Sequence, residues 1–476
     1  MNFKKIKKSL LLVSAILFIG GANQTFGEET NTTMKNITFK NVSVHDPSII
    51  KVEDTYYIVG SHLAFAKSTD LVDWKQLSIS VREGNLLFPK PYESLKEVFE
   101  YAQTKTMWAG DIIKLKDGKY HYYFSACKGD QPLSVLGVAT SEKVDGPYDD
   151  IQVFLKSGSN KSTVKGYNAT KDPNAVDPAV FFDSEGKFWM VYGSYSGGIF
   201  MLEMDENTGL PKEGQGWGKK ILGGNHSRIE APYILQNKEN GYYYLFLSYG
   251  GLDYTGAYNV RIAKSKNPDG PYYDAEGNDM INSKGKDGSF FDDKTISKYG
   301  VKVLGNFTWD ESVATAKSGY VSPGHNSAYF DKETGKYFII FHTRLVNQGE
   351  KHQVRVHEMK FNENGWPVVM PFRYTAESFE NEKISSINGE FKVIVDSKEI
   401  TNVIKTPVKV QFNNNGTITG ALKGSWKITD GNKLKLEIDG KSYSGFVEKQ
   451  WNEYDKKIVT AFSVLGNEGY GIWAYQ

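Results

Sequence analysis

The hydrophobic and polar positions of the first 380 residues form a pattern that occurs five times. Each copy has a short apolar segment, a polar turn and an aromatic-rich segment. The apolar segments are SIIK (48–51), DIIKL (111–115), AVFF (179–182), PYIL (232–235) and SAYF (327–330). The aromatic segments are TYYIVGS (55–61), KYHYYFSA (119–126), KFWMVYGS (187–194), GYYYLFLS (241–248) and KYFIIFHT (336–343). Turns such as KDGK and ETGK between apolar runs predict five β-hairpins.

The distance between successive hairpins leaves room for two further strands in each copy. A single four-stranded sheet cannot bury both of its faces, so repeated sheets of this kind pack around a common axis. We therefore expect residues 28–380 to form a five-bladed β-propeller. A β-sandwich that contains similar hairpins is the alternative fold.

The strand pattern changes near residue 380. The polar stretch ESFENEKISSINGEF precedes strands of a different rhythm, among them FKVIVD, VKVQFN and KLKLEID. Residues 381–476 are therefore expected to form a small C-terminal β-barrel or sandwich, and the fold class is all-β. The composition agrees, since aromatic residues make up 14% of the chain and 47 of its 476 residues are glycine. Trp426, Trp451 and Trp473 are sugar-platform candidates, with core packing as the favoured interpretation.

The first 27 residues have the pattern of a secretory signal peptide. Lysines at positions 4, 5, 7 and 8 precede the apolar run LLLVSAILFIGG, which is too short to span a bilayer. An uncleaved membrane anchor is the alternative. Cleavage would give a secreted, extracellular protein with 53 basic and 56 acidic residues. This balance predicts neither a nucleic acid nor a membrane as partner.

One ionisable residue lies at the start of the first strand of every predicted hairpin. These residues are Asp46, Asp111, Asp177, Glu230 and His325. The innermost strand of each blade lines the channel of a propeller, so the five side chains should converge near one face. Crowded carboxylates raise one another's pKa and reduce stability, which favours a functional site. Turn formation by single aspartates and a site that only binds a metal ion are the alternatives.

A second group of residues should lie beside these acids, because the second strand of each hairpin returns to the channel mouth. Hydroxyl, aromatic, glycine and cationic residues occur there, and they suit a polyhydroxylated ligand such as a sugar. The candidates for substrate binding are His45, Trp108, Gly129, Asn174, Gly193, Ser194, Tyr195, His226, Arg228 and Arg344.

Six motifs in this part of the chain resemble those of glycoside hydrolase family 43. They are HDPSII (45–50), WAGDI (108–112), VDPAVFF (176–182), GSYSGGIF (193–200), GGNHSRIEAPYI (223–234) and GHNSAYF (324–330). The resemblance runs from about residue 38 to the C-terminus, and within the family it is strongest to the secreted, two-domain endo-α-1,5-L-arabinanases of bacilli.

The resemblance implies a five-bladed propeller, in agreement with the hairpin count. It also implies hydrolysis of internal α-1,5-L-arabinofuranosidic bonds in arabinan and arabino-oligosaccharides of the plant cell wall. We expect the protein to be a monomer. An exo-acting arabinofuranosidase or β-xylosidase of the same family is one alternative. A non-catalytic propeller that binds sugar is another.

By the same resemblance, Asp46 matches the general base, Glu230 the general acid and Asp177 the carboxylate that orients the acid and tunes its pKa. His325 matches a histidine that holds one calcium ion in the central channel, mostly through waters. The segment WAGDI departs from the commoner small residue or proline before Asp111. Acids on the first and fourth blades face each other across a channel, which suits the separation of about 6.5–9.5 Å of inverting enzymes. We therefore expect a single-displacement, inverting mechanism.

Overall fold

The computed structural model describes residues 37–158, 164–377, 379 and 382–476. The predicted signal peptide and the expected domain boundary at 380–381 lie outside the described residues. Among the described residues, no helix is both long enough and apolar enough to cross a membrane.

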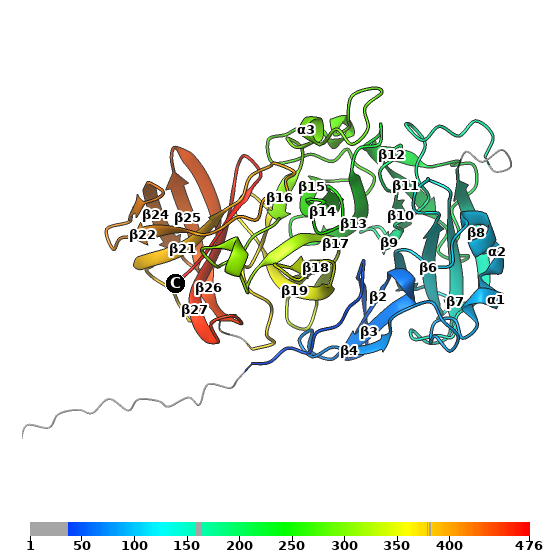
Figure 1. The fold of residues 1–476 in the computed structure, drawn as a ribbon, viewed down its shortest axis with the longest axis horizontal. Coiled ribbons are helices and arrows are strands. Elements are labelled where there is room, and N and C mark those ends of the chain that lie inside the picture. Colours follow the sequence, from blue (N-terminus) through cyan, green and yellow to red (C-terminus); the bar gives the residue numbers. More distant parts are fainter. Residues whose placement is uncertain (1–36, 159–163, 378, 380–381) are drawn as a thin grey trace, which may run out of the picture. The chain divides into compact units, whose positions relative to one another are not determined.

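Twenty strands of the described chain form five antiparallel sheets, each built from four consecutive strands (Figure 1). The first blade contains β1 (Ser48–Val52), β2 (Thr55–Gly60), β3 (Ala64–Ser68) and β4 (Lys75–Ser78). The second contains β5 (Gly110–Lys114), β6 (Tyr120–Cys127), β7 (Ser134–Ser141) and β8 (Asp149–Ser157). The third contains β9 (Ala179–Phe182), β10 (Phe188–Tyr192), β11 (Ile199–Met204) and β12 (Lys219–Leu222).

The last two blades follow the same plan. The fourth contains β13 (Ile229–Asn237), β14 (Tyr242–Tyr249), β15 (Asn259–Ser265) and β16 (Val301–Leu304). The fifth contains β17 (Tyr320–Asp331), β18 (Lys336–Leu345), β19 (His352–Phe361) and β20 (Pro367–Val369). The short helices are α1 (Pro91–Ser94), α2 (Lys96–Ala102), α3 (Asp293–Ile296) and the 3₁₀ turns η1 (Ser61–Leu63), η2 (Met280–Asn282) and η3 (Val313–Thr315).

The five predicted hairpins are the first two strands of the five blades. In the first blade, Ser48 pairs with Val59 and Val52 pairs with Thr55 across the tight turn. Both faces of the second strands are covered by neighbouring blades, and for this reason β6 is buried along its whole length. The sequence-based prediction of a five-bladed propeller is confirmed.

The fifth blade packs against the first and closes the ring. The Ser327 hydroxyl donates to the carbonyl of Pro47 at 2.8 Å, and the Lys51 ammonium lies 3.1 Å from the Asp331 carboxylate. One apolar cluster combines residues of β1, β2 and β3 with residues of β18 and β19. The two ends of the propeller sequence therefore meet at one seam.

The C-terminal strands form a closed eight-stranded barrel. They are β21 (Gly389–Val395), β22 (Val408–Phe412), β23 (Thr417–Gly420), β24 (Gly424–Thr429), β25 (Lys433–Ile438), β26 (Lys441–Asn452), β27 (Lys457–Gly466) and β28 (Gly471–Tyr475). Closure comes from β21, which pairs with both β22 and β28. The C-terminal domain is therefore a barrel and not a sandwich.

The barrel shares apolar packing with the last two blades. Trp473 of β28 lies edge-on to Phe307 at 5.2 Å between ring centroids, within one cluster that includes residues of β14–β20 and of the barrel. Trp451 is also buried, and Trp426 is half-buried against the barrel core. This packing agrees with the core interpretation of the three tryptophans.

Candidate active site

The backbone positions the predicted acids by leaving regular strand geometry where they occur. Asp46 and Asp177 each lie two residues before an inner strand, and both have left-handed φ angles, 58° and 56°. Glu230 precedes Ala231, which has φ 56°, at a register shift in β13. His325 has φ 43° at a similar shift in β17. Such strained residues persist where surrounding structure holds them, and they cluster at functional sites.

These irregular segments surround one small central cavity. All five inner strands, or the residues just before them, contribute to its wall. The ionisable and amide side chains in its wall are those of Asp46, Asp177, Tyr233, His325 and Asn326. The inner-strand starts therefore converge on the axis.

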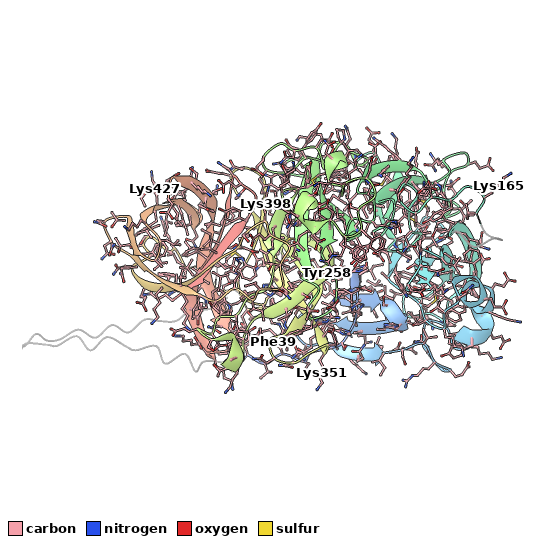
Figure 2. All side chains as sticks on the ribbon, turned by 45° about the horizontal axis from the view of Figure 1, so that its top comes forward. Phe39, Lys165, Tyr258, Lys351, Lys398 and Lys427 are labelled. Atoms are coloured by element: carbon pink, nitrogen blue, oxygen red, sulfur yellow. The ribbon has the colours of Figure 1, made fainter. Side chains whose placement is uncertain are left out.

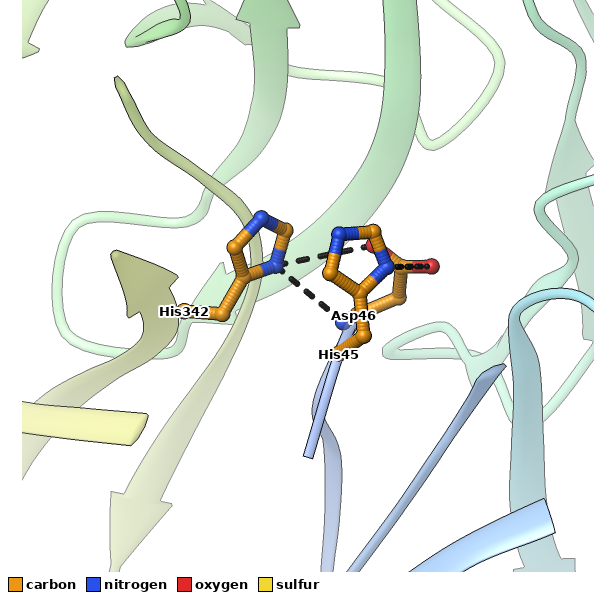
Figure 3. A group of neighbouring side chains, drawn as sticks. All are labelled: His45, Asp46 and His342. Atoms are coloured by element: carbon orange, nitrogen blue, oxygen red, sulfur yellow. Dashed lines mark hydrogen bonds and ion pairs between the residues drawn. The ribbon is translucent and has the colours of Figure 1, made fainter. Parts of the chain in front are cut away.

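Asp46 lies among hydrogen-bond and ion-pair partners from the first and last blades (Figure 3). Its Oδ2 accepts a hydrogen bond from the Ser61 hydroxyl and lies 2.9 Å from His45 Nδ1. Its Oδ1 lies 2.9 Å from His325 Nδ1. Burial raises the pKa of Asp46, but His325 and His45 outweigh this effect and hold it well below its usual value. Asp46 is therefore ionised at neutral pH.

His342 also supports Asp46, at its backbone. Its Nδ1 accepts a hydrogen bond from the Asp46 backbone N–H at 3.1 Å, so the neutral ring carries its proton on Nε2. The ring stacks on His45 with centroids 4.1 Å apart. Burial keeps the pKa of His342 well below its usual value. His342 thus acts as a neutral acceptor that fixes the backbone at Asp46.

Glu230 is buried and held by two hydroxyl groups. The Ser194 hydroxyl donates to Oε2 and the Tyr258 hydroxyl donates to Oε1, both at 2.7 Å. Tyr258 lies near the middle of the propeller (Figure 2). Burial raises the pKa of Glu230, and the two hydrogen bonds oppose this effect without cancelling it.

Asp177 has a strongly raised pKa. Burial raises its pKa to about 8, with His325 opposing this effect and the charge on Glu230 adding to it. Asp177 Oδ2 also accepts a hydrogen bond from the Ala231 N–H at 3.1 Å, which joins the third blade to the fourth. Since a negative charge on either carboxyl disfavours ionisation of the other, Asp177 and Glu230 titrate as a pair that retains a proton at neutral pH.

The ends of the second strands lie beside the acids, as the hairpin geometry predicts. Ser61 and Ser194 donate to Asp46 and Glu230, as described above. In the fourth blade, Ser248 Oγ accepts a hydrogen bond from the His325 N–H at 2.7 Å.

The substrate-binding candidates differ in their surroundings. His45 and Ser194 contact the acids directly. Trp108 is half-buried, and a Cβ at Gly129 would lie 3.8 Å from its ring, so these two residues are neighbours. A Cβ at Gly193 would lie 2.4 Å from a backbone oxygen, which explains the glycine there.

Three candidates have polar groups engaged by partners other than the acids. Asn174 Oδ1 accepts a hydrogen bond from Ser134, Arg228 forms a bidentate ion pair with Asp293, and Arg344 pairs with Glu350. Tyr195 and His226 contact an aromatic pair on the loop before α3.

Asp111 differs from the other acids. It lies within β5, where it accepts hydrogen bonds from Ser48 Oγ, the Val180 N–H and the Ile112 N–H at 2.6, 2.8 and 2.9 Å. Burial raises its pKa to about 6. These bonds join the first three blades, so Asp111 has a structural role and the expectation that all five ionisable groups form one site does not hold for it.

Sequence reasoning missed Tyr258 and Asn326. Tyr258 precedes the third strand of its blade, and the repeat pattern covers only the first two strands. Asn326 directly follows His325 in GHNSAYF, which was a usable signal. Neither side-chain amide atom of Asn326 has a hydrogen-bond partner among the described residues, although both are buried.

Comparisons with known proteins agree with this geometry. The sequence model of Glycosyl hydrolases family 43 matches residues 36–367, and that of a C-terminal lipocalin-like domain matches residues 371–474. The chain is 51% identical to extracellular endo-α-(1→5)-L-arabinanase 2 of Bacillus subtilis over 96% of this chain and 98% of that protein. It is 48% identical to the extracellular endo-α-(1→5)-L-arabinanase of Thermotoga petrophila, over 92% and 94% of the two chains.

A solved structure extends the similarity to three dimensions. The crystal structure of a glycoside hydrolase family 43 protein from Bacillus licheniformis has a TM-score of 0.89 and 53% identity, and covers 92% of this chain and 99% of that one. Both the family model and the full-length relatives span the propeller and its acids. The chain therefore belongs to glycosyl hydrolases family 43.

Proposed function

We propose that this protein is an endo-α-1,5-L-arabinanase that cleaves arabinan by a single displacement with inversion. The observation that supports the mechanism best is that the pKa values of the clustered carboxyl groups are displaced in opposite directions. Asp46 has a pKa held well below its usual value, whereas the pKa values of Glu230 and Asp177 are raised. Titratable groups whose environments separate their pKa values are the usual base and acid of such a site.

The chemistry follows from these protonation states. Cleavage needs a base that activates water and an acid that protonates the leaving oxygen. Ionised Asp46 accepts a proton from water as the water oxygen attacks the anomeric carbon. Glu230 donates its proton to the glycosidic oxygen as the C–O bond breaks. Asp177 and Glu230 hold a proton between them at neutral pH, and in this mechanism the proton is on Glu230 when the C–O bond breaks; a charge on Asp177 then disfavours ionisation of Glu230.

The substrate assignment rests on similarity along the whole chain. Both full-length relatives are named extracellular endo-arabinanases, and each aligns over more than nine-tenths of its length. We propose the same substrate and the same extracellular location for this protein.

We also propose that the central cavity holds one calcium ion near His325. The surroundings fit a small hydrated cation, since the cavity wall includes two carboxyl side chains and the buried Asn326 amide, whose oxygen has no partner in the described chain. Oxygen atoms of this kind are the ligands that calcium prefers. A bound ion would supply fixed positive charge that stabilises the clustered carboxylates.

The catalytic assignment is tested with Glu230→Gln and Asp46→Asn. Each change should reduce kcat on linear arabinan by about 10²–10⁴-fold, the usual contribution of general acid–base catalysis. A substrate with a good leaving group should restore activity to Glu230→Gln but not to Asp46→Asn, because only the acid assists departure. Glu239→Gln is the matched control, because Glu239 is exposed and lies in the turn between β13, which contains Glu230, and β14. Full activity of either catalytic variant would refute its role.

Two further measurements test the mode of action. Proton NMR of the first product should show the inverted anomer, and a retained anomer would contradict single displacement. Endo cleavage should lower the viscosity of linear arabinan before much reducing sugar appears. Release of arabinose alone from the outset would favour an exo-acting enzyme.

A further inference from the structure

Phe290 and Phe291 form an exposed aromatic pair on the loop between η2 and α3. Phe290 is 66% exposed and Phe291 is 44% exposed, and their ring centroids are 4.4 Å apart. Of the large hydrophobic side chains that are exposed among the described residues, only Phe290 and Phe291 are adjacent in sequence. Phe290 is the most exposed of them all. Adjacent exposed apolar side chains of this kind mark binding surfaces.

The pair packs against segments that lead to the proposed catalytic acid. The Phe290 ring lies 4.7 Å from the His226 ring, and the Phe291 ring lies 5.5 Å from the Tyr195 ring. The Arg228 guanidinium lies 5.8 Å from the centroid of Phe291. The aromatic pair thus rests on the two segments that contain Tyr195 and residues 226–228.

Both of these segments continue directly into the environment of Glu230. Arg228 precedes Glu230 by two residues, at the start of β13. Tyr195 follows Ser194, whose hydroxyl donates to the Glu230 carboxyl. The exposed rings are therefore continuous with the acid side of the site through short stretches of backbone.

The loop that carries the pair is braced in place. The Gly285 N–H donates to Ser227 Oγ at 2.7 Å, and Asn225 Nδ2 donates to the Gly285 carbonyl at 2.9 Å and to Asp287 Oδ1 at 3.0 Å. The bidentate pair between Arg228 and Asp293 closes the other end of the loop. A preformed surface loses little conformational entropy when a ligand binds.

The matched charges beneath the pair favour an uncharged occupant. The positive charge of Arg228 is matched by Asp293, so the base of the platform does not attract a polyanion or an acidic peptide. Sugar rings present C–H faces that pack on aromatic rings, and the exposed rings of Phe290 and Phe291 offer such a surface.

We propose that Phe290 and Phe291 form an outer subsite that stacks a furanose ring of the arabinan chain, beyond the residues on either side of the cleaved bond. This inference rests on the proposed function, because it takes arabinan as the ligand. It assigns the loop before α3 to the recognition of long substrate.

The test compares substrates of different length. Phe290→Ala should lower kcat/KM on linear arabinan about two- to tenfold more than on arabinotriose, the range expected for loss of one aromatic contact. Phe290→Tyr should restore the ratio of the two values and Phe290→Leu should not, because stacking needs a ring face. Tyr273→Ala removes an exposed aromatic ring at the far end of β15 and is the matched control. Affinity electrophoresis in arabinan gels, with Glu230→Gln as the background, should show weaker retention for the double variant with Phe290→Ala.

Each outcome decides one question. An equal loss on short and long substrates, or no loss on either, would overturn the outer subsite while leaving the proposed function intact. If the unaltered protein does not cleave arabinan, the proposed function itself fails. Sedimentation that shows a dimer, converted to a monomer by Phe290→Ala without a change in kinetics, would reassign the pair to contact between copies of this chain.

Discussion

Replacement of Tyr258 by phenylalanine would remove one hydroxyl from the environment of Glu230 and leave the aromatic ring in place. The hydroxyl donates to Glu230 Oε1 at 2.7 Å, and both side chains are buried. This hydrogen bond stabilises the ionised carboxylate and therefore lowers the pKa of Glu230. Its loss should raise that pKa further, so the acid keeps its proton to higher pH.

The expected magnitude follows from the strength of such a bond. A buried hydrogen bond to a charged group contributes about 1.5–3 kcal/mol, and about 1.4 kcal/mol corresponds to a tenfold change in an equilibrium constant. The alkaline limb of the kcat/KM profile should therefore move up by about one to two pH units. The maximal rate should fall, because the carboxyl loses one of its two fixed contacts.

The assay is the rate of arabinan hydrolysis between pH 4 and 10, with reducing sugar as the readout. Tyr123→Phe is the matched control, because it removes a buried tyrosine hydroxyl that donates to the Gly209 carbonyl at 2.7 Å in the second blade. The control should lose some stability and keep the pH profile of the unaltered enzyme. An unchanged or lowered alkaline limb in Tyr258→Phe would refute the assignment of Tyr258 and Glu230.

Three other predictions address stability and the ion. Burial raises the pKa of Asp177 to about 8, so up to that pH the folded protein binds more protons than the unfolded chain. Its free energy of unfolding therefore falls as pH rises. Asp177→Asn should flatten this fall, as measured by denaturant titration at pH 5 and pH 8. Chelation by EDTA should lower activity and Tm, and added calcium but not sodium should restore both; no effect on either quantity would exclude the ion. Deletion of residues 382–476 should expose Phe307 and its apolar neighbours and reduce Tm or solubility. Each large apolar side chain that returns to water costs about 1.5–3 kcal/mol. A soluble fragment with unchanged Tm would show that the shared core is dispensable.

The sequence predicted those features that depend on local pattern. The hairpins follow from short apolar and aromatic segments separated by turns, and their number determines the blades. The convergence of Asp46, Asp177 and Glu230 follows from their similar offsets from the second strands. Ser194 was found by the same logic, because an antiparallel hairpin brings its second strand back to the starting level.

Other features depend on contacts that local pattern does not encode. Asp111 has an offset close to those of the other acids, but hydrogen bonds from neighbouring blades engage its carboxyl group. Barrel closure requires β21 to pair with β28, which is distant in sequence. Tyr258 and Phe290 lie in segments outside the repeated hairpin, so the hairpin pattern makes no prediction about them.

The seam of the propeller has a consequence for how activity arises during synthesis of the chain. Asp46 belongs to the first blade made, whereas His325 and His342, which set its charge and fix its backbone, belong to the last. A chain that stops before β17 contains Asp46, Asp177 and Glu230, but its Asp46 lacks His325 and His342. Under the proposed mechanism, fragments of the propeller are inactive and not merely weakened. Hydrolysis therefore indicates that the ring of blades has closed. The activity recovered after refolding is then proportional to the number of molecules whose propeller is complete.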